Sequence, residues 1–463
     1  MGIRDVAETA QRVVRDRLRF GERSITADTK RDLHNAAASI RTLALAVVVS
    51  VAMGVAGWAF LAALRLVTGA RETHLWLFAL LPLVNIATAW VYRNHGLRSR
   101  QGNNLVIDST LTGTPIHARM ALLTFLCGTA THLVGGSAGR EGAAVQMGGT
   151  IASNVAARFG VTGHDRRDLM MAGISAAFGA AFGTPLAGAF FGMEMCFIGK
   201  LDYSAALYCL VGSFTGNAVS RALGTPFVFQ NIGAVPEMTP AVLALVVISA
   251  IAFGLAARLF SLAIRCVKRL YARFTHYLAA ATAGGLVLTA LFLVCGLSRY
   301  GGLSEWMVGA AFAGNTTLFD PLAKLALTAL TVGAGFQGGE VTPLFGIGAS
   351  LGGWIGSATL GDPAFMAALG MLGVFGSALN VPITTVMLGI DMFGGAAGGY
   401  FVIVAFISYL VAGHRAVYVA QRIVTPKRRS LKDDVSLTVN EAIARHHEEI
   451  AGLEQEKEEG EDA

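Results

Sequence analysis

Between two apolar runs lies the stretch Gly135-Gly136-Ser137-Ala138-Gly139-Arg140-Glu141-Gly142-Ala143-Ala144-Val145-Gln146-Met147-Gly148-Gly149, which sets an arginine and a glutamate inside a glycine-rich break. No Asp, Glu, Lys or Arg occurs in residues 120–139 or 142–157. The first run is long enough to cross a bilayer, which takes about 20 apolar residues, whereas the second is short and is typical of a broken helix. A carboxylate at membrane depth costs at least ~2.5 kcal/mol and usually marks an ion or proton pathway, so Glu141 is the first functional candidate.

The composition is that of a polytopic membrane protein. Hydrophobic residues make up 54% of the chain and charged residues only 14%, whereas soluble globular proteins carry roughly 25% charged residues. The net charge of +6 is consistent with basic cytoplasmic flanks, and no basic-aromatic surface module indicates nucleic-acid binding. The five cysteines are scattered and no pair has metal-ligand spacing, so neither a metal nor another cofactor is expected.

The charge pattern predicts four regions. Residues 1–40 mix basic and acidic groups and are expected to form a cytoplasmic amphipathic arm. Residues 41–222 and 238–420 each hold a set of apolar runs, including expected spans at 120–139 and 169–193. Residues 421–463 have the composition of a disordered cytoplasmic tail without a regulatory domain. We therefore expect a multi-pass protein of the inner cell membrane, in contact with the lipid bilayer and with both termini in the cytoplasm.

The two sets of apolar runs echo each other. Residues 180–186 align with residues 377–383 at an offset of 197, which also brings Glu194 onto Asp391. With an offset of 199, residues 139–141 fall on residues 338–340, so that Glu141 matches Glu340. Matches in this order predict an internal duplication, which the alignment alone does not define as parallel or inverted. Repeats with short, glycine- or proline-broken helices indicate a transporter whose site lies between the halves, where helix N-termini attract an anion.

Four segments in order resemble the signatures of the CLC family of chloride channels and chloride/proton antiporters. The family motifs GSGxP, GREGP and GxFxP have as counterparts Gly102-Asn103-Asn104-Leu105-Val106, Gly139-Arg140-Glu141-Gly142-Ala143 and Gly339-Glu340-Val341-Thr342-Pro343, and the family tyrosine is best matched by Tyr418. The resemblance covers roughly residues 35–425. It implies an all-α polytopic membrane protein with an internal inverted repeat of many short, tilted and broken helices, and a homodimer in which each subunit has its own ion path.

The departures from these motifs resemble the fluoride-specific branch of the family. Asn103 replaces the serine that donates to the central anion in chloride members, and Val341 replaces the usual phenylalanine. Met195 stands where the chloride/proton antiporters have an inward glutamate. The resemblance therefore implies a fluoride/proton antiporter that exports fluoride. A chloride/proton antiporter or voltage-gated chloride channel of the same family is the alternative. An enzyme is not expected, since neither GxSxG nor HExxH occurs.

Fluoride is small and strongly hydrated, so a site for it needs several strong hydrogen-bond donors. The expected anion-binding residues, which combine side-chain donors with helix N-termini, are Asn103, Asn104, Gly142, Ala143, Val341, Thr342 and Tyr418. Aromatic ring edges could also face the ion, but the sequence does not identify which phenylalanines. Ionised Glu141 can occupy the anion site, and protonated Glu141 must leave it and can carry a proton. For Glu340 we expect a role in the proton route or in anion selection.

Simpler roles are open for several of these residues. Asn103 is a candidate helix N-cap, and Tyr418 a candidate interfacial tyrosine. An ion pair between Arg140 and Glu141 is not expected, because adjacent residues on a helix do not face each other. Arg140 is instead expected to satisfy carbonyl groups near the entrance. Structural or packing roles are expected for four further residues, Glu194, Asp391, His117 and His132.

Overall fold

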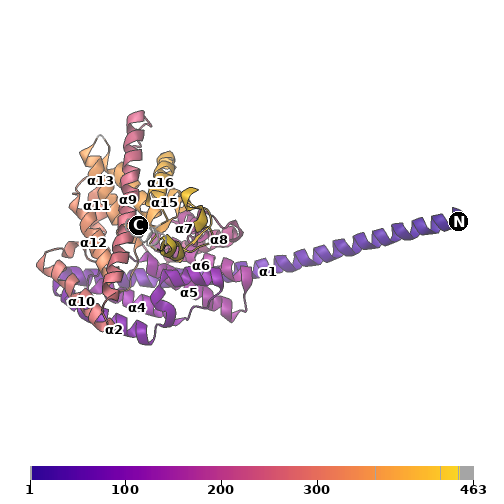
Figure 1. The fold of residues 1–463 in the computed structure, drawn as a ribbon, viewed down its shortest axis with the longest axis horizontal. Helices are drawn as coiled ribbons and strands as arrows, with labels where there is room; N and C mark the ends of the chain where they lie inside the picture. The colour runs from indigo at the N-terminus through magenta and orange to yellow at the C-terminus, as the bar shows by residue number, and fades with distance from the viewer. Residues whose placement is uncertain (1–2, 360, 415, 428, 447, 449–463) are drawn as a thin grey trace, which may run out of the picture.

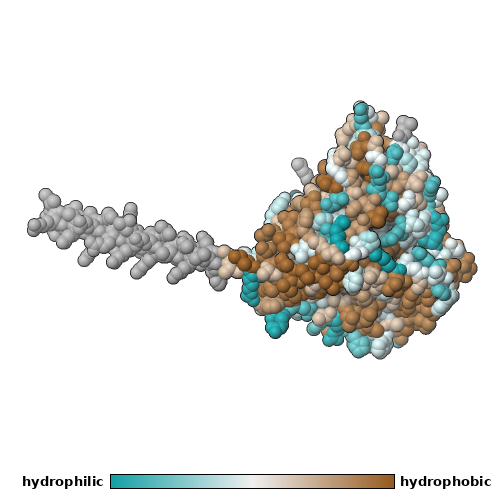
Figure 2. Space-filling view, turned by 180° about the vertical axis from the view of Figure 1, so that it is seen from behind, coloured by the Kyte–Doolittle hydropathy of each residue, from teal (hydrophilic) through white to brown (hydrophobic). Residues whose placement is uncertain are grey.

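The computed structural model describes residues 3–359, 361–414, 416–427, 429–446 and 448, and the described part is mostly helical (Figure 1). Five segments in it are long and apolar enough to cross a membrane, namely Ala36–Thr73, Leu75–Asn94, Pro240–Ala272, Tyr277–Val294 and Gly395–Ala412. Broad hydrophobic areas lie on the face of the body seen in Figure 2, with hydrophilic residues between them, and such areas are expected where lipid is the solvent. The predicted all-α membrane fold is therefore confirmed.

The α-helices of the first half are α1 (Ile3–Thr73), α2 (Leu81–Asn94), α3 (Asn103–Thr112), α4 (Arg119–Leu133), α5 (Glu141–Arg158), α6 (Gly163–Phe182), α7 (Pro185–Glu194) and α8 (Ala206–Ala222). Those of the second half are α9 (Pro240–Ala272), α10 (Tyr277–Thr289), α11 (Trp306–Phe312), α12 (Phe319–Gly333), α13 (Val341–Ala358), α14 (Pro363–Leu379), α15 (Pro382–Phe393) and α16 (Gly398–Ala412). The predicted arm forms the N-terminal part of α1, which projects from the body (Figure 1). Its amphipathic character stays a prediction, because the side chains of residues 3–35 lie outside the described ones.

Two expected spans are shorter than the apolar runs suggested. Helix α4 ends at Leu133, ahead of Gly135 with its positive φ of 81°. The run 169–193 is divided into α6 and α7 at Gly183, which has a φ of 74° and is followed by Pro185 at the first position of α7. A left-handed residue ends a helix, and proline begins the next one without losing a needed N–H. The expectation of continuous spans at 120–139 and 169–193 was therefore wrong.

The two halves are joined at equivalent positions. Gly139 N–H donates to the Gly339 carbonyl at 2.6 Å, and Gly339 N–H donates to the Gly139 carbonyl at 2.7 Å. This antiparallel pair has local two-fold symmetry. Around it α4 packs on α5 as α12 packs on α13, and α7 packs against its counterpart α15. The internal duplication predicted from the sequence is thus visible as a repeated helix arrangement.

The register of this repeat differs by one residue from the sequence alignment. Helix α5 begins at Glu141 and α13 begins at Val341, so the offset is 200 rather than 199. Glu340 is therefore the counterpart of Arg140, and the counterpart of Glu141 is Val341. The sequence alignment was off by one residue because it matched two glutamates by residue type, each of which follows closely after a glycine. The prediction that Glu141 and Glu340 are equivalent was wrong.

Glu194 and Asp391 tie α7 and α15 together in a reciprocal way. The Glu194 carboxylate accepts from Ile383 N–H at 3.1 Å, and from the N–H and hydroxyl of Thr384 at 2.8 and 2.7 Å. Asp391 in turn accepts from Ala187 N–H at 2.9 Å. Each carboxylate sits at the end of its own helix and satisfies free N–H groups at the start of the other. The structural role expected for both residues is confirmed.

The segment after α16 is folded against the body. Strand β2 (Arg422–Ile423) pairs in parallel with β1 (Phe197–Ile198), and Gln421 donates to the carbonyls of Met195 and Leu379 at 2.9 and 2.7 Å. Ile423, Val439 and Ala442 are buried in one small cluster. The predicted disorder was therefore wrong for residues 421–427 and 429–446. Residues 449–463 lie outside the described ones.

His414, a buried histidine, contacts this segment at two points. His414 Nδ1 lies 3.2 Å from Asp434 Oδ2, and His414 Nε2 accepts from Lys427 N–H at 2.9 Å. Burial lowers the pKa of His414, an effect that outweighs the opposing influence of Asp434; Lys427 and His446 lower it further. A proton on Nε2 would break the bond from Lys427. A lowered histidine pKa supports stability above the unfolded value of roughly 6.5, and this contribution is lost as the pH falls below it.

We therefore expect residues 421–446 to exchange amide hydrogens faster at pH 5.5 than at pH 7.5, after correction for the intrinsic rates. Hydrogen exchange measured by mass spectrometry checks this. His414→Gln keeps one donor and one acceptor without titrating, so it should remove the pH dependence. Equal protection of this segment at both pH values in the parent protein would contradict the proposal that neutral His414 stabilises it.

Candidate functional site

The Glu141 carboxylate occupies the N-terminus of α13. Its Oε2 accepts from Thr342 N–H at 3.1 Å and from the Thr342 hydroxyl at 2.5 Å, and the side chain is 1% exposed. Thr342 N–H belongs to the first turn of α13, where backbone donors have no partner within the helix and the helix dipole favours negative charge. A carboxylate thus fills a position that suits an inorganic anion.

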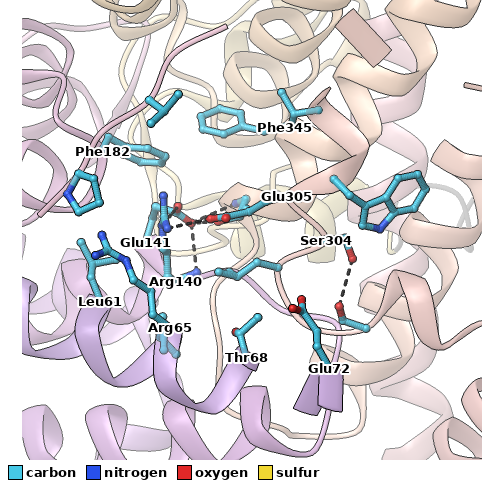
Figure 3. Close-up of a pocket in the computed structure, with 18 of the residues that line it drawn as sticks. Leu61, Arg65, Thr68, Glu72, Arg140, Glu141, Phe182, Ser304, Glu305 and Phe345 are labelled. Carbon is cyan, nitrogen blue, oxygen red and sulfur yellow. Dashed lines mark hydrogen bonds and ion pairs between the residues drawn. The ribbon is translucent and has the colours of Figure 1, made fainter. Parts of the chain in front are cut away.

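Arg140 bridges this carboxylate to the surface. Arg140 Nε lies 3.2 Å from Glu141 Oε1, and Arg140 Nη1 lies 3.0 Å from Glu305 Oε1 (Figure 3). The expectation that Arg140 and Glu141 do not pair was wrong. Arg140 precedes the first residue of α5 and is not in the helix body, so the side chain can fold back over its neighbour. Its predicted partners were carbonyl groups, whereas the structure pairs it with two carboxylates.

A cavity of about 980 Å³ leads to Glu141 from this side. Its charged lining residues are Arg65, Arg71, Arg140, Arg299, Glu72, Glu141 and Glu305, so the wall carries both cations and carboxylates. Phe182 and Phe345 lie close to Glu141, with ring centroids 5.3 Å apart (Figure 3). They are two of the phenylalanines that line the cavity.

Asn103, Gly142, Glu340 and Tyr418 meet on the other side of the glycine pair. Asn103 Nδ2 donates to the Tyr418 hydroxyl at 3.2 Å. A Cβ atom on Gly142 would lie 2.9 Å from Asn103 Nδ2 and 3.5 Å from Glu340 Oε2, which brings these groups around one point. It would also lie 2.8 Å from the Gly339 Cα atom, so glycine is required for the two helix starts to approach this closely.

Two polar atoms of this cluster have no hydrogen-bond partner among the described residues. They are Asn103 Oδ1 and Glu340 Oε2, both buried. An unsatisfied buried polar group costs about 1–3 kcal/mol, and more when charged, so these two atoms are candidates to contact an ion, a proton or water. The cluster therefore combines an amide and a phenol with one carboxyl oxygen that has no hydrogen-bond partner among the described residues.

The simpler roles considered for Asn103 and Tyr418 were wrong. Gly102, with a φ of 58°, takes the N-cap position of α3, and Asn103 is the first helical residue. Tyr418 is 2% exposed and contacts Asn103, whereas an interfacial tyrosine would be half exposed. Asn104 Oδ1 accepts from Ala420 N–H at 3.0 Å, so this side chain holds the segment that carries Tyr418.

The other predicted anion-binding residues lie in the first turns of the two central helices. Ala143 is in α5 and Val341 begins α13, and both are buried. Their backbone N–H groups are among those that have no acceptor within the helix. His132 is buried in the last turn of α4, with Nδ1 2.8 Å from the Gly128 carbonyl and Nε2 3.2 Å from the Ala138 carbonyl, and His117 is exposed, so neither belongs to the site.

Sequence reasoning missed a polar group beside this cluster. Gln146 Oε1 accepts from the Thr124 hydroxyl at 2.9 Å and from Gln337 Nε2 at 2.8 Å. Gln146 is 3% exposed and follows Gly142 by one helical turn, so both lie on the same face of α5. A glutamine in an otherwise apolar, uncharged stretch was the signal that could have identified it.

Known proteins resemble this chain in sequence. The family described as voltage gated chloride channel matches residues 84–413. "Chloride/fluoride channel protein" of Pseudomonas syringae pv. tomato is 37% identical over 409 residues, which cover 86% of this chain and 90% of that protein. "H(+)/Cl(-) exchange transporter ClcA" of Vibrio cholerae is 25% identical over 272 residues, which cover 55% of this chain and 58% of that one.

Solved structures show the same fold. The crystal structure of a CLC-type fluoride/proton antiporter superimposes with a TM-score of 0.81 at 33% identity, covering 83% of this chain and 98% of that one. A slow cyanobacterial Cl⁻/H⁺ antiporter gives a TM-score of 0.69 at 22% identity, covering 82% and 96%. The chain belongs to the family of voltage-gated chloride channels, the CLC family. The predicted family and its inverted-repeat fold are confirmed.

Proposed function

We propose that this protein is a fluoride/proton antiporter that exports fluoride across the cell membrane. The observation that carries the proposal is the Glu141 carboxylate bound at the N-terminus of α13, where an anion would bind. A titratable carboxylate that occupies an anion site can be replaced there by fluoride when it binds a proton. The "Chloride/fluoride channel protein" and the CLC-type fluoride/proton antiporter that this chain resembles support the choice of ion.

Exchange follows from competition between Glu141 and fluoride. Ionised Glu141 accepts the Thr342 donors, and a fluoride ion needs the same donors. Protonated Glu141 has lost the charge that the helix terminus attracts, so it leaves and carries its proton into the cavity lined by Arg140. Fluoride entry is thereby linked to proton binding without a large movement of the helices.

Glu340 supplies a second link between proton and anion. Its free Oε2 lies beside Asn103 and Tyr418, so an ionised Glu340 and a fluoride ion in the same cluster would repel each other. Fluoride binding there therefore goes together with a neutral Glu340. The amide of Asn103 and the phenol of Tyr418 provide the strong donors that a small, strongly hydrated anion needs.

Chloride/proton exchange or a chloride channel is the second candidate, because the fold is shared with proteins of those activities. Asn103 and the Glu340–Val341 pair favour fluoride over it. We further propose a homodimer in the inner cell membrane with cytoplasmic termini. Exposed apolar side chains on α8 and α16, such as Phe214 and Phe406, suit contact with lipid or with a second copy.

Efflux from liposomes loaded with fluoride or chloride, followed by ion electrodes and a pH indicator, tests the proposal. We expect fluoride efflux to exceed chloride efflux by at least about 100-fold, or about 2.7 kcal/mol in barrier height, and to drive proton uptake. Comparable rates for the two halides would contradict the choice of ion. Fluoride efflux without proton movement would contradict antiport.

A further inference from the structure

Helix α2 has a polar buried face and an apolar exposed face. Asn85, Thr88 and Tyr92 are at most 4% exposed and recur at a spacing of three and four residues, so they form one stripe. Leu83 and Trp90, in contrast, are 63% and 48% exposed. A membrane helix hides polar groups only where they meet protein partners or a water-filled route.

The polar stripe faces α4, α10 and the loop that leads into α13. Asn85 Nδ2 donates to the carbonyl of Ala281 in α10 at 2.9 Å and to that of Ala334 in this loop at 3.3 Å. The Tyr92 hydroxyl faces Thr124 of α4, and it has no hydrogen bond of regular geometry to a described residue. Thr124 then donates to Gln146 at 2.9 Å, and Gln337 donates to the same oxygen of Gln146 at 2.8 Å.

This chain of side chains connects two defined places. At one end, Gln337 stands three residues before Glu340, and Gln146 stands one turn after Gly142, which lies beside Asn103 and Glu340. At the other end, Tyr92 is followed by the exposed residues Arg93, Asn94 and His95. Leu75, ahead of α2, lines the cavity above Glu141. Because the 14-residue α2 then extends roughly 21 Å, its Tyr92 end lies away from that cavity.

We propose that Tyr92, Thr124, Gln146 and Gln337 line the inward leg of the proton route, a corridor between Glu340 and the loop after α2. The proposal rests on the proton-coupled transport proposed above. Water in the corridor carries the proton, each molecule accepting one proton and passing on another, so no group along it changes its net charge. Hydroxyl groups such as those of Tyr92 and Thr124 both donate and accept, and the two amides orient the water.

Met195, the other candidate position for an inward proton acceptor, carries no titratable group. Met195 is fully buried, and its neighbour Glu194 is engaged by the N-terminus of α15 through Ile383 and Thr384. Glu340, by contrast, has a free carboxyl oxygen and adjoins the corridor. A proton that reaches Glu340 from the opposite side of the membrane to the cavity can therefore travel beside the anion path rather than through α7.

Thr124→Val and Gln146→Leu test the corridor, because they remove its polar groups with little change of volume. Thr150→Val is the matched control: Thr150 is equally buried and lies one turn beyond Gln146 on α5, but its hydroxyl donates to the Gln146 backbone carbonyl at 2.7 Å rather than to a corridor side chain. Proton uptake driven by a fluoride gradient is measured in liposomes. Fluoride affinity is measured by calorimetry on the purified full-length protein.

We expect both corridor variants to lower proton uptake at least about tenfold while the fluoride Kd stays within about twofold, a difference below 0.5 kcal/mol. The control should behave like the parent. Thr124→Val removes a single hydroxyl and stays informative if Gln146→Leu does not fold.

Three results would overturn the corridor. They are parental proton uptake in both variants, an equal loss in Thr150→Val, or a fluoride affinity that falls in step with proton uptake. A parent protein that moves fluoride without protons would instead overturn the proposed function, and the corridor with it.

Discussion

Glu141→Gln is expected to abolish proton movement driven by a fluoride gradient, by at least about 100-fold, which corresponds to about 2.7 kcal/mol. Glutamine has nearly the same shape and can still accept from Thr342 N–H, so the fold should remain intact. It cannot ionise, however, and therefore neither competes with fluoride as an anion nor delivers a proton to the cavity. Fluoride and pH traces recorded together from the same liposomes measure the effect.

Glu72→Gln is the matched control for this variant. Glu72 lines the same cavity, is exposed and lies 3.6 Å from Arg71, so its loss changes the charge of the wall without touching Glu141. We expect its proton-to-fluoride ratio to equal that of the parent. Fluoride-coupled proton movement that persists in Glu141→Gln would exclude Glu141 as the exchanging group.

Glu340→Ala is expected to reduce coupled fluoride transport at least about tenfold, or about 1.4 kcal/mol. The substitution removes the carboxyl group beside Asn103 and Tyr418, and with it the repulsion that links fluoride binding to protonation. Glu340→Gln shows whether a loss of transport comes from the missing charge or from the missing side-chain volume, since it keeps the volume and loses only ionisation. A similar loss in both variants indicates that ionisation is what matters.

The control for Glu340 is Glu237→Ala, which removes a carboxylate on an exposed segment ahead of α9. Its transport should be unchanged in the same liposome assay. If Glu340→Ala carries fluoride at the parental rate and with parental coupling, the residue has no part in the proton route or in anion selection.

The sequence predicted the fold class, the family and the residues around the two central helix starts. These features depend on local chemistry, such as charge-free runs, glycine breaks and short motifs. Helix ends were predicted less well, because a run of apolar residues does not show where Gly183 turns the chain. The folded residues 421–427 and 429–446 were missed for a different reason. Its order comes from contacts with distant groups, such as the Met195 carbonyl, that its own composition does not reveal.

The sequence also did not predict which side chains contact one another within the site. Arg140 meets Glu141 because it precedes the helix, which a helical spacing rule does not consider. The hydrogen bonds of Gln146 with Thr124 and Gln337 depend on how α4 and the loop before α13 pack against α5, which the sequence does not show.

Gly139 and Gly339 lie at the local two-fold axis that relates the two halves. A duplicated membrane protein built from inverted halves has no intrinsic front or back. Here the residues that follow Gly139 and Gly339 are Arg140 and Glu340, a cation and a carboxyl group at equivalent positions. One of them faces the wide cavity and the other faces the cluster around Tyr418. The two sides of the glycine pair therefore differ in charge, although the backbone around them is related by local two-fold symmetry.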